Sequence, residues 1–254
     1  MTRRRYELTE TEWEIISPLL PNKPRGVPRV DDRRVINGIL WRFRAGSPWA
    51  DIPERYGPST TCYNRFVRWR KAGVWDRILA DISKAFDGDI IMIDSSCVRV
   101  HQHGATGKKG GLDDGCMGRS RGGLTTKIHA VVDAEGRPIA LELTAGQAHD
   151  SQMALTMLSA MREGTIVLGD KAYDTNALRA AASEKKAWAN IPAKSNRKDG
   201  FAFSGWVYRQ RNLVERFFNK LKQFRGIATR YDKNPLNFLG AVKIVASRIW
   251  IRAL

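Results

Sequence analysis

The chain has 254 residues, 43% of them hydrophobic and 9% aromatic, which suffices for one large or two modest domains with cores of their own. This length excludes a short disulfide-stapled scaffold, and no stretch approaches the roughly 18 consecutive apolar residues that a membrane span needs. Lys and Arg number 43 against 26 Asp and Glu, a net charge of +17. Such an excess of positive charge predicts a polyanionic partner.

The cysteines argue against a disulfide framework. Cys62, Cys97 and Cys116 are odd in number and form no CxxC pair, so they indicate neither paired disulfides nor a clustered zinc site. The first 20 residues lack the apolar core of a signal peptide. We therefore expect reduced thiols and a cytoplasmic protein.

Residues 1–87 show helical periodicity broken by Pro and Gly. We predict helices over Thr9–Leu20, Asp31–Ala45 and Ser59–Ala72, and a short turn at Trp49–Tyr56.

The segment Trp49–Tyr56, a turn at Gly57–Ser59 and then Thr60–Lys71 have the proportions of a helix-turn-helix. An ordinary helical hairpin with a solvated basic face is the alternative. The second helix carries the side chains that we predict to contact DNA: Arg65, Arg68, Arg70 and Lys71.

From Asp89 onward the sequence alternates between strand and helix patterns. We predict a domain boundary near Gly88, a helical DNA-binding domain over 1–87 and a mixed α/β domain over 88–254. The predicted strands are Ile90–Ile93, Thr125–Val132, Pro138–Leu143 and Thr165–Leu168. The predicted helices are Gln152–Arg162, Asn176–Ser183, Val207–Phe224 and Pro235–Arg252.

Two basic segments suggest contacts with a phosphate backbone. Residues 104–123 hold eight Gly and four Lys or Arg, which predicts a mobile loop that drapes over such a backbone. From Lys185 to Lys233, 13 basic and 3 acidic residues give a net charge of +10, which could line a DNA channel. A merely solvated basic surface is the alternative.

Two aspartates follow buried-type strands. Asp94 ends the run IIMID and Asp170 ends TIVLGD, and the carboxyl ends of such strands face the crevice where α/β sheets bind ligands. The two carboxylates could share a divalent ion. Each could also be a simple turn or cap residue.

A polar stripe runs along the predicted helix YRQRNLVERFFNKLK. Tyr208, Arg211, Glu215 and Lys222 fall at offsets 0, 3, 7 and 14, which at about 100° per residue confines them to an arc of roughly 60°. Apolar residues project from the opposite side, so the helix could bury one face and turn the stripe toward a site. A plain charged helix surface explains the pattern equally well.

These residues resemble the DDE transposases of bacterial insertion sequences, in the group marked by a Tyr-x2-Arg-x3-Glu-x6-Lys signature. Tyr208, Arg211, Glu215 and Lys222 match all four positions. The family carries its first Asp after a short apolar strand, as in IDSSCVRVHQ, and its second in an Asp-x-Gly/Ala-Tyr/Phe motif. Asp170, Ala172 and Tyr173 match that second motif.

The resemblance covers nearly the whole chain. It implies a ribonuclease H-like mixed sheet flanked by helices, preceded by a small all-α helix-turn-helix domain. It also implies that Asp94, Asp170 and Glu215 are catalytic and hold two Mg²⁺ ions, with Mn²⁺ as a substitute. DNA-positioning roles are implied for Tyr208, Arg211 and Lys222.

The implied function is that of a transposase, which binds the terminal inverted repeats of its element, cleaves the DNA ends and joins them to target DNA. We expect a homodimer or higher assembly on DNA, associated with the nucleoid. A non-catalytic DNA-binding protein derived from a transposase, or a nuclease of the same core fold, is the alternative. The four histidines form no metal-ligand set, and the absence of GxxxxGK[ST] predicts no nucleotide cofactor.

Overall fold

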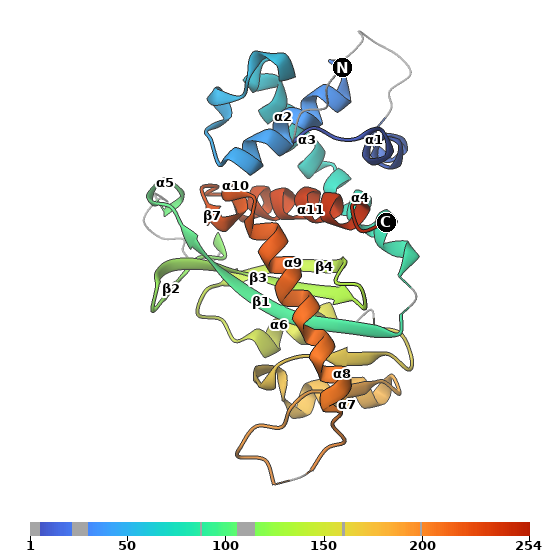
Figure 1. The fold of residues 1–254 in the computed structure, drawn as a ribbon. Coiled ribbons are helices and arrows are strands. Elements are labelled where there is room, and N and C mark those ends of the chain that lie inside the picture. The colour runs from blue at the N-terminus through green and yellow to red at the C-terminus, as the bar shows by residue number, and fades with distance from the viewer. Residues whose placement is uncertain (1–5, 22–29, 87, 106–114, 159–160, 199) are drawn as a thin grey trace. The chain divides into compact units, whose positions relative to one another are not determined.

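The computed structural model describes residues 6–21, 30–86, 88–105, 115–158, 161–198 and 200–254 (Figure 1). The chain folds into two compact units. Unit 1 combines residues 1–84, 101–106 and 221–254, and unit 2 combines residues 85–100 and 107–220. Of the basic, Gly-rich segment 104–123 that was predicted as a mobile loop, residues 106–114 lie outside the described residues, whereas 118–120 and 123 belong to strands.

Unit 1 begins with helices whose ends follow from their sequences. A reciprocal capping box between Thr9 and Glu12 starts α1 (Glu10–Ile16), which a 3-10 turn η1 (Ser17–Leu19) extends. Helix α2 (Asp32–Ala45) ends at Gly46, whose φ of 72° favours glycine. These helices, and α3 (Ser59–Lys71), confirm the predicted ones. The sequence prediction missed α4 (Val74–Ile82).

The segment Trp49–Tyr56 differs from a regular first helix of a helix-turn-helix. It forms two 3-10 turns, η2 (Trp49–Asp51) and η3 (Glu54–Tyr56), because Pro53 holds the preceding Ile52 in an extended conformation. The longer helices that pack together here are α2 and α3. Residues 46–58 join them, which exceeds the turn of about three or four residues in that motif.

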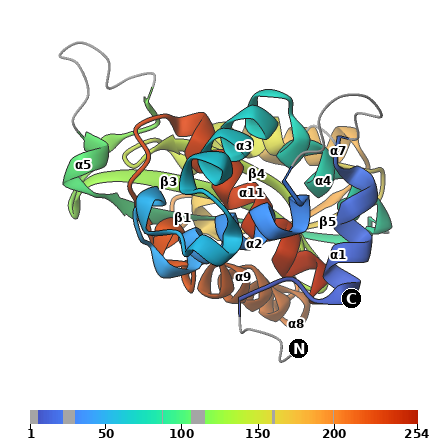
Figure 2. The same ribbon diagram turned by 90° about the horizontal axis from the view of Figure 1, so that it is seen from above.

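The C-terminal residues belong to unit 1. They form α10 (Arg225–Ala228), a short strand β7 (Thr229–Arg230) and the long helix α11 (Pro235–Ile251), which packs on α4, α3 and α1. Figure 2 shows α11 among the N-terminal helices. A short helix α5 (Gln102–Ala105) also lies in this unit. Our prediction placed 88–254 in one domain, whereas in the structure residues 221–254 form a compact unit with the N-terminal helices.

A mixed sheet is the centre of unit 2. Strand β1 (Ile90–Val100) pairs antiparallel with β3 (Gly123–Asp133), which also pairs antiparallel with β2 (Gly118–Ser120) and β4 (Pro138–Ala145). On its other side, β1 runs parallel to β5 (Ile166–Leu168), and β5 runs parallel to β6 (Trp188–Asn190). All four predicted strands are present.

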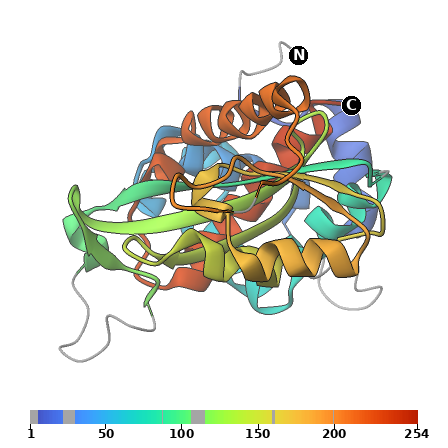
Figure 3. The ribbon, with the colours of Figure 1, turned by 90° about the horizontal axis from the view of Figure 1, so that it is seen from below.

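Helices cover both faces of this sheet. Figures 1 and 3 show α6 (Asp150–Met157) and α7 (Asn176–Glu184) on one face and α9 (Asn212–Lys222) crossing the other. Ile91 and Ile93 of β1 are buried in one cluster with residues of α6 and α7. Since side chains alternate along a strand, Met92 and Asp94 point to the opposite face. The sheet thereby presents Asp94 on the side of α9.

The predicted helix Val207–Phe224 is interrupted. Ser204 caps α8 (Gly205–Tyr208), the 3-10 turn η7 (Arg209–Arg211) follows, and α9 then begins at Asn212. Tyr208 and Arg211 therefore precede the regular helix that carries Glu215. None of the helices in the described part of the chain has the length and apolar character that crossing a bilayer requires.

Candidate active site

Asp94 lies in the middle of β1, next to the apolar run Ile90–Ile93. Its Oδ1 accepts a hydrogen bond from the Ser95 N–H at 2.8 Å, and its Oδ2 accepts one from Arg211 Nη1 at 2.9 Å. The Asp94 side chain is 18% exposed, so it is not sealed from solvent.

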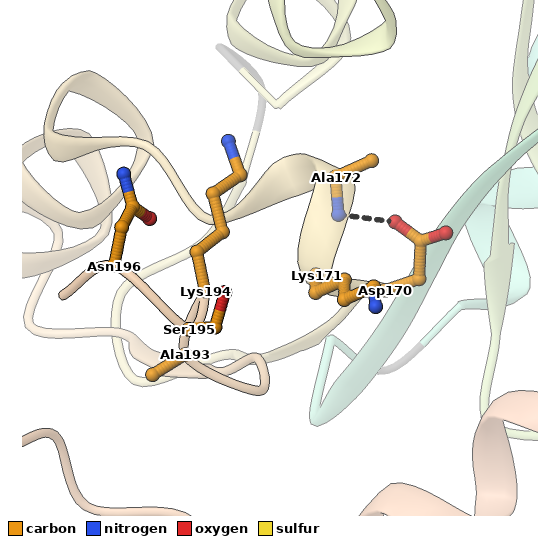
Figure 4. Close-up of a pocket in the computed structure, with 7 residues that line it drawn as sticks. All are labelled: Asp170, Lys171, Ala172, Ala193, Lys194, Ser195 and Asn196. Atoms are coloured by element: carbon orange, nitrogen blue, oxygen red, sulfur yellow. Dashed lines mark hydrogen bonds between the residues drawn. The ribbon is translucent and has the colours of Figure 1, made fainter.

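Asp170 comes next to Asp94 through the pairing of β1 with β5. The parallel register matches Ile90 with Ile166 and Met92 with Leu168, so the two aspartates follow at the same relative position. Asp170 then caps the 3-10 turn η6 (Lys171–Tyr173), with its Oδ1 accepting the Ala172 N–H at 2.8 Å (Figure 4). Strand pairing thus brings together two carboxylates that are 76 residues apart in sequence.

Glu215 reaches the same region from α9, through Arg211. Arg211 Nη2 donates to Glu215 Oε1 at 2.5 Å while Nη1 donates to Asp94, so one guanidinium bridges the two carboxylates. The Glu215 side chain is 51% exposed. Arg211 also lies over the Tyr208 ring, with its Cζ 5.8 Å from the ring centroid.

The electrostatics place Asp170 in this cluster as well. Burial raises the pKa of Asp94, and the neighbouring Asp170 raises it further, against the Ser95 N–H and Arg211, which favour the carboxylate. Burial by itself lowers the pKa of Arg211. Interactions with Asp94, Tyr208, Glu215 and Asp170 outweigh it, so the pKa of Arg211 is raised. Two carboxylates therefore contact a single guanidinium, and the third, Asp170, acts on it electrostatically.

The donor chemistry suits a hard divalent ion, because three carboxylates supply the oxygen ligands that Mg²⁺ prefers. The arrangement itself is not that of a metal site: among the described residues, no three His, Cys, Asp or Glu side chains are placed to hold one ion together. Arg211 lies between Asp94 and Glu215. For these two carboxylates to share an ion, Arg211 has to move away.

The remaining predicted residues of the polar stripe lie around this cluster or beyond it. Tyr208 ends α8, and its ring centroid is 5.3 Å from that of Phe203. Lys222 is the last residue of α9 and belongs to unit 1.

The predicted DNA contacts of α3 divide into two kinds. Arg65 is buried, with 6% of its surface exposed, and its guanidinium forms an ion pair with Asp32. Arg70 is half-buried, and its Nε donates to Asn237 Oδ1 at 3.0 Å. Arg68 and Lys71 are exposed. The placement of Arg65 does not suit a contact with a DNA groove.

Behind Asp94 lies a polar network that sequence reasoning missed. Ser95 Oγ donates to Asp150 Oδ1 at 3.0 Å, and Lys127 Nζ donates to the same oxygen at 2.7 Å. The fully buried Tyr173 lies near this network, and burial together with Asp150 and Asp94 raises the pKa of its hydroxyl. No local pattern indicates such a network, because its members come from four separate elements.

Two family models match this chain. Residues 85–250 match the family model "Transposase DDE domain", and residues 8–79 match "Putative transposase of IS4/5 family". The chain is 40% identical over 130 residues to a Brucella ovis protein named "Putative transposase for insertion sequence element IS6501", covering 51% of this chain and all of that protein. It is 39% identical over 108 residues to the Sinorhizobium fredii protein y4sN, covering 41% of this chain and 86% of that protein.

A solved structure shares the fold. The piggyBac transposase in a synaptic complex with hairpin DNA aligns with a TM-score of 0.53 at 11% identity, over 95% of this chain and 70% of that one. Such a low identity supports the ribonuclease H-like fold alone. The match to the family model "Transposase DDE domain" spans more than half of the chain and includes Asp94, Asp170 and Glu215. The chain therefore belongs to the DDE transposase family, whose members are metal-dependent enzymes that cut and transfer DNA strands.

Proposed function

We propose that this transposase binds the terminal inverted repeats of its insertion sequence, cleaves the DNA there and joins the ends to target DNA, with Asp94, Asp170 and Glu215 as its catalytic carboxylates. The observation that carries the proposal is the gathering of these three side chains around Arg211. Arg211 lies 2.9 Å from Asp94 and 2.5 Å from Glu215, and Asp170 acts electrostatically on both Asp94 and Arg211.

The three carboxylates would hold two Mg²⁺ ions, or Mn²⁺ in their place, which supply activation of the attacking hydroxyl and stabilisation of the leaving oxygen. Asp94 lies on β1, and Asp170 follows two residues after the end of β5, which pairs with β1, so the sheet fixes the position of one and restrains the other. Glu215 reaches in from a helix and is the most exposed of the three. When Arg211 leaves the carboxylates, its guanidinium is suited to bind a DNA phosphate in two-point contact.

The same site serves two nucleophiles. Water attacking the phosphodiester at an element end gives a nick, and the 3′-OH that the nick releases attacks target DNA to give the joined product. Because two ends must be joined, we propose that at least two protomers assemble on the DNA, in the cytoplasm at the nucleoid. Recognition of the ends is assigned to residues 1–87, where Arg68 and Lys71 are exposed on α3, and catalysis to residues 88–254, with Lys222 as a further contact to DNA.

Neutral replacements of the carboxylates test the proposal. Glu215→Gln, Asp94→Asn and Asp170→Asn each keep the size of the side chain and remove its charge. With Mg²⁺ and a duplex that carries the inverted repeat flanking the gene, each variant should lose nicking and joining by at least about a thousandfold. In a gel-shift assay, each should still bind the duplex.

Glu163→Gln is the matched control, because Glu163 is exposed and pairs with Lys186, away from the cluster. It should keep full activity. Substantial joining by purified Glu215→Gln contradicts the assignment of Glu215. A wild-type protein that binds without cutting indicates a non-catalytic derivative, and one that nicks without joining indicates a nuclease.

A further inference from the structure

A pocket beside Asp170 is left unexplained by the carboxylate cluster. It has a volume of about 530 Å³, and its walls are two short segments: Asp170–Ala172, and Ala193–Asn196 after β6 (Figure 4). Figure 4 shows the Lys194 side chain extended between Asn196 and Ala172. Asp170, a proposed catalytic carboxylate, forms one wall, so whatever fills the pocket lies next to the reacting atoms.

The lining combines positive charge with small side chains. Lys171 and Lys194 bring two ammonium groups, and within the described part of the chain no carboxylate forms an ion pair with either of them. Ala172 and Ala193 leave room for a flat or puckered ring, and Asn196 offers both a hydrogen-bond donor and an acceptor. Cations beside apolar walls suit a ligand that has both a phosphate and a ring.

The wall formed by residues 193–196 is held in place from below by Asp174. The Asp174 carboxylate is fully buried and accepts hydrogen bonds from the Lys194 N–H at 2.8 Å, Arg197 at 2.6 Å and Arg179 at 2.7 Å. Both arginines also lie over the Phe201 ring, with the Cζ of Arg179 3.9 Å and that of Arg197 5.1 Å from the ring centroid. Because the hydrogen bond to Asp174 fixes the backbone of Lys194, the lysine side chain starts from a defined position in the pocket wall.

A second pocket continues this basic surface. It has a volume of about 520 Å³, shares Lys194 and Asn196 with the first and adds Lys198, as well as Arg197 and the Asp174 with which Arg197 forms an ion pair. Lysine side chains therefore line both adjoining pockets. A nucleic acid strand carries one phosphate per nucleotide and would meet such a surface with successive phosphates.

We propose that the pocket beside Asp170 binds the nucleotide next to the scissile phosphate, with its phosphate on Lys171 and Lys194 and its sugar or base against Ala172 and Ala193. The inference rests on the proposed function, because it takes Asp170 as part of the catalytic centre. A pocket volume of 530 Å³ lies within the range of about 300 to 1,000 Å³ that small-molecule sites occupy, so one nucleotide fits.

The test pairs a lysine variant with single neutral phosphates in the DNA. The probe is a duplex with the inverted repeat and its flank, in which one phosphate at a time is replaced by an uncharged methylphosphonate. Binding is measured by fluorescence anisotropy in EDTA. For the wild-type protein, the replacement adjacent to the scissile position should weaken binding by about tenfold, since it removes a charge-assisted contact.

Lys194→Ala should weaken binding to the unmodified duplex by a similar factor. In this variant, a methylphosphonate next to the scissile position should no longer reduce the affinity further, whereas methylphosphonates at other positions should keep their penalty, which is the loss of affinity that each causes. Lys171→Ala should act at the same position. Folding should be unaffected, because the backbone N–H of Lys194 makes the bond to Asp174. Lys186→Ala, at a lysine that lines neither pocket, should keep every penalty.

The proposal is overturned if Lys194→Ala and Lys171→Ala both keep the full penalty at every position, even with weaker overall binding, because the lysines would then act as diffuse charge. Cleavage by Glu215→Gln is assayed on the same duplex. If Glu215→Gln loses cleavage while the lysine variants keep every methylphosphonate penalty, only the proposed nucleotide binding in the pocket is refuted. Retained cleavage by Glu215→Gln refutes the catalytic assignment whatever the penalties show.

Discussion

Arg211 and Asp94, 117 residues apart in the chain, form an ion pair with Nη1 2.9 Å from Oδ2. The other amino group of Arg211 donates to Glu215. A positive side chain therefore lies between two carboxylates that are proposed to bind metal. The Arg211 guanidinium holds these two carboxylates together against their mutual repulsion. It also occupies the space that a shared metal ion needs.

Removal of Arg211 should tighten the binding of divalent metal in the absence of DNA. In Arg211→Ala, the carboxylates lose their cationic partner, so the affinity for Mn²⁺ measured by titration calorimetry should rise by about tenfold. Arg209→Ala, which removes an exposed neighbouring arginine, should leave the affinity unchanged. Equal affinities in wild type and Arg211→Ala would show that the guanidinium does not compete with metal.

The basic residues of α3 should separate into structural and DNA-binding ones. Arg68→Ala and Lys71→Ala should weaken binding to the element end and lower the salt dependence by about one counterion each. Gel shifts over a range of salt concentrations measure both effects. Unchanged salt slopes in both variants would remove α3 from the DNA interface.

Arg65→Ala should instead destabilise the fold. The ion pair with Asp32 is nearly buried, with side-chain exposures of 7% and 11%, so the variant leaves an unpaired carboxylate in the interior. The free energy of unfolding should fall by about 3 kcal/mol in urea titrations. A variant as stable as wild type would mean that Asp32 finds water or another partner.

Asp174 should make stability depend on acid. Burial by itself raises the pKa of Asp174, but hydrogen bonds from Arg197, the Lys194 N–H and Arg179 lower it to about 2. The pKa of an unfolded aspartate is about 3.9. The stabilisation is therefore present above about pH 4 to 5 and is lost as the pH falls through 2, by roughly 2 to 3 kcal/mol in total. Asp174→Asn should abolish this part of the acid dependence.

His129 should add a second pH dependence in a milder range. Burial lowers its pKa to about 4, from about 6.5 in an unfolded chain, and its Nε2 lies 2.7 Å from Thr144 Oγ1. Since the unfolded state binds the proton first, stability should fall as the pH drops from 6.5 to 4, by about 3 kcal/mol. His129→Gln should flatten the curve there. An unchanged curve would locate the titrating group elsewhere.

Local patterns predicted most elements of the fold, because caps and periodicity act over a few residues. Thr175 accepts the Leu178 N–H at the start of α7, as its position before the helix indicated. Short or crowded elements were missed. Strand β6 has three residues and no alternating pattern, and α4 begins directly after Gly73, which reads as a terminator of the preceding helix.

The sequence by itself determined the chemistry of the chain: strong positive charge, two aspartates after apolar runs and a glutamate in a spaced polar stripe. The tertiary structure decided which side chains meet. It placed Arg211 between Asp94 and Glu215 and buried Arg65 against Asp32. It also made residues 221–254 part of unit 1. Composition and periodicity are properties of neighbouring residues, whereas these contacts depend on strand register and helix packing between distant segments.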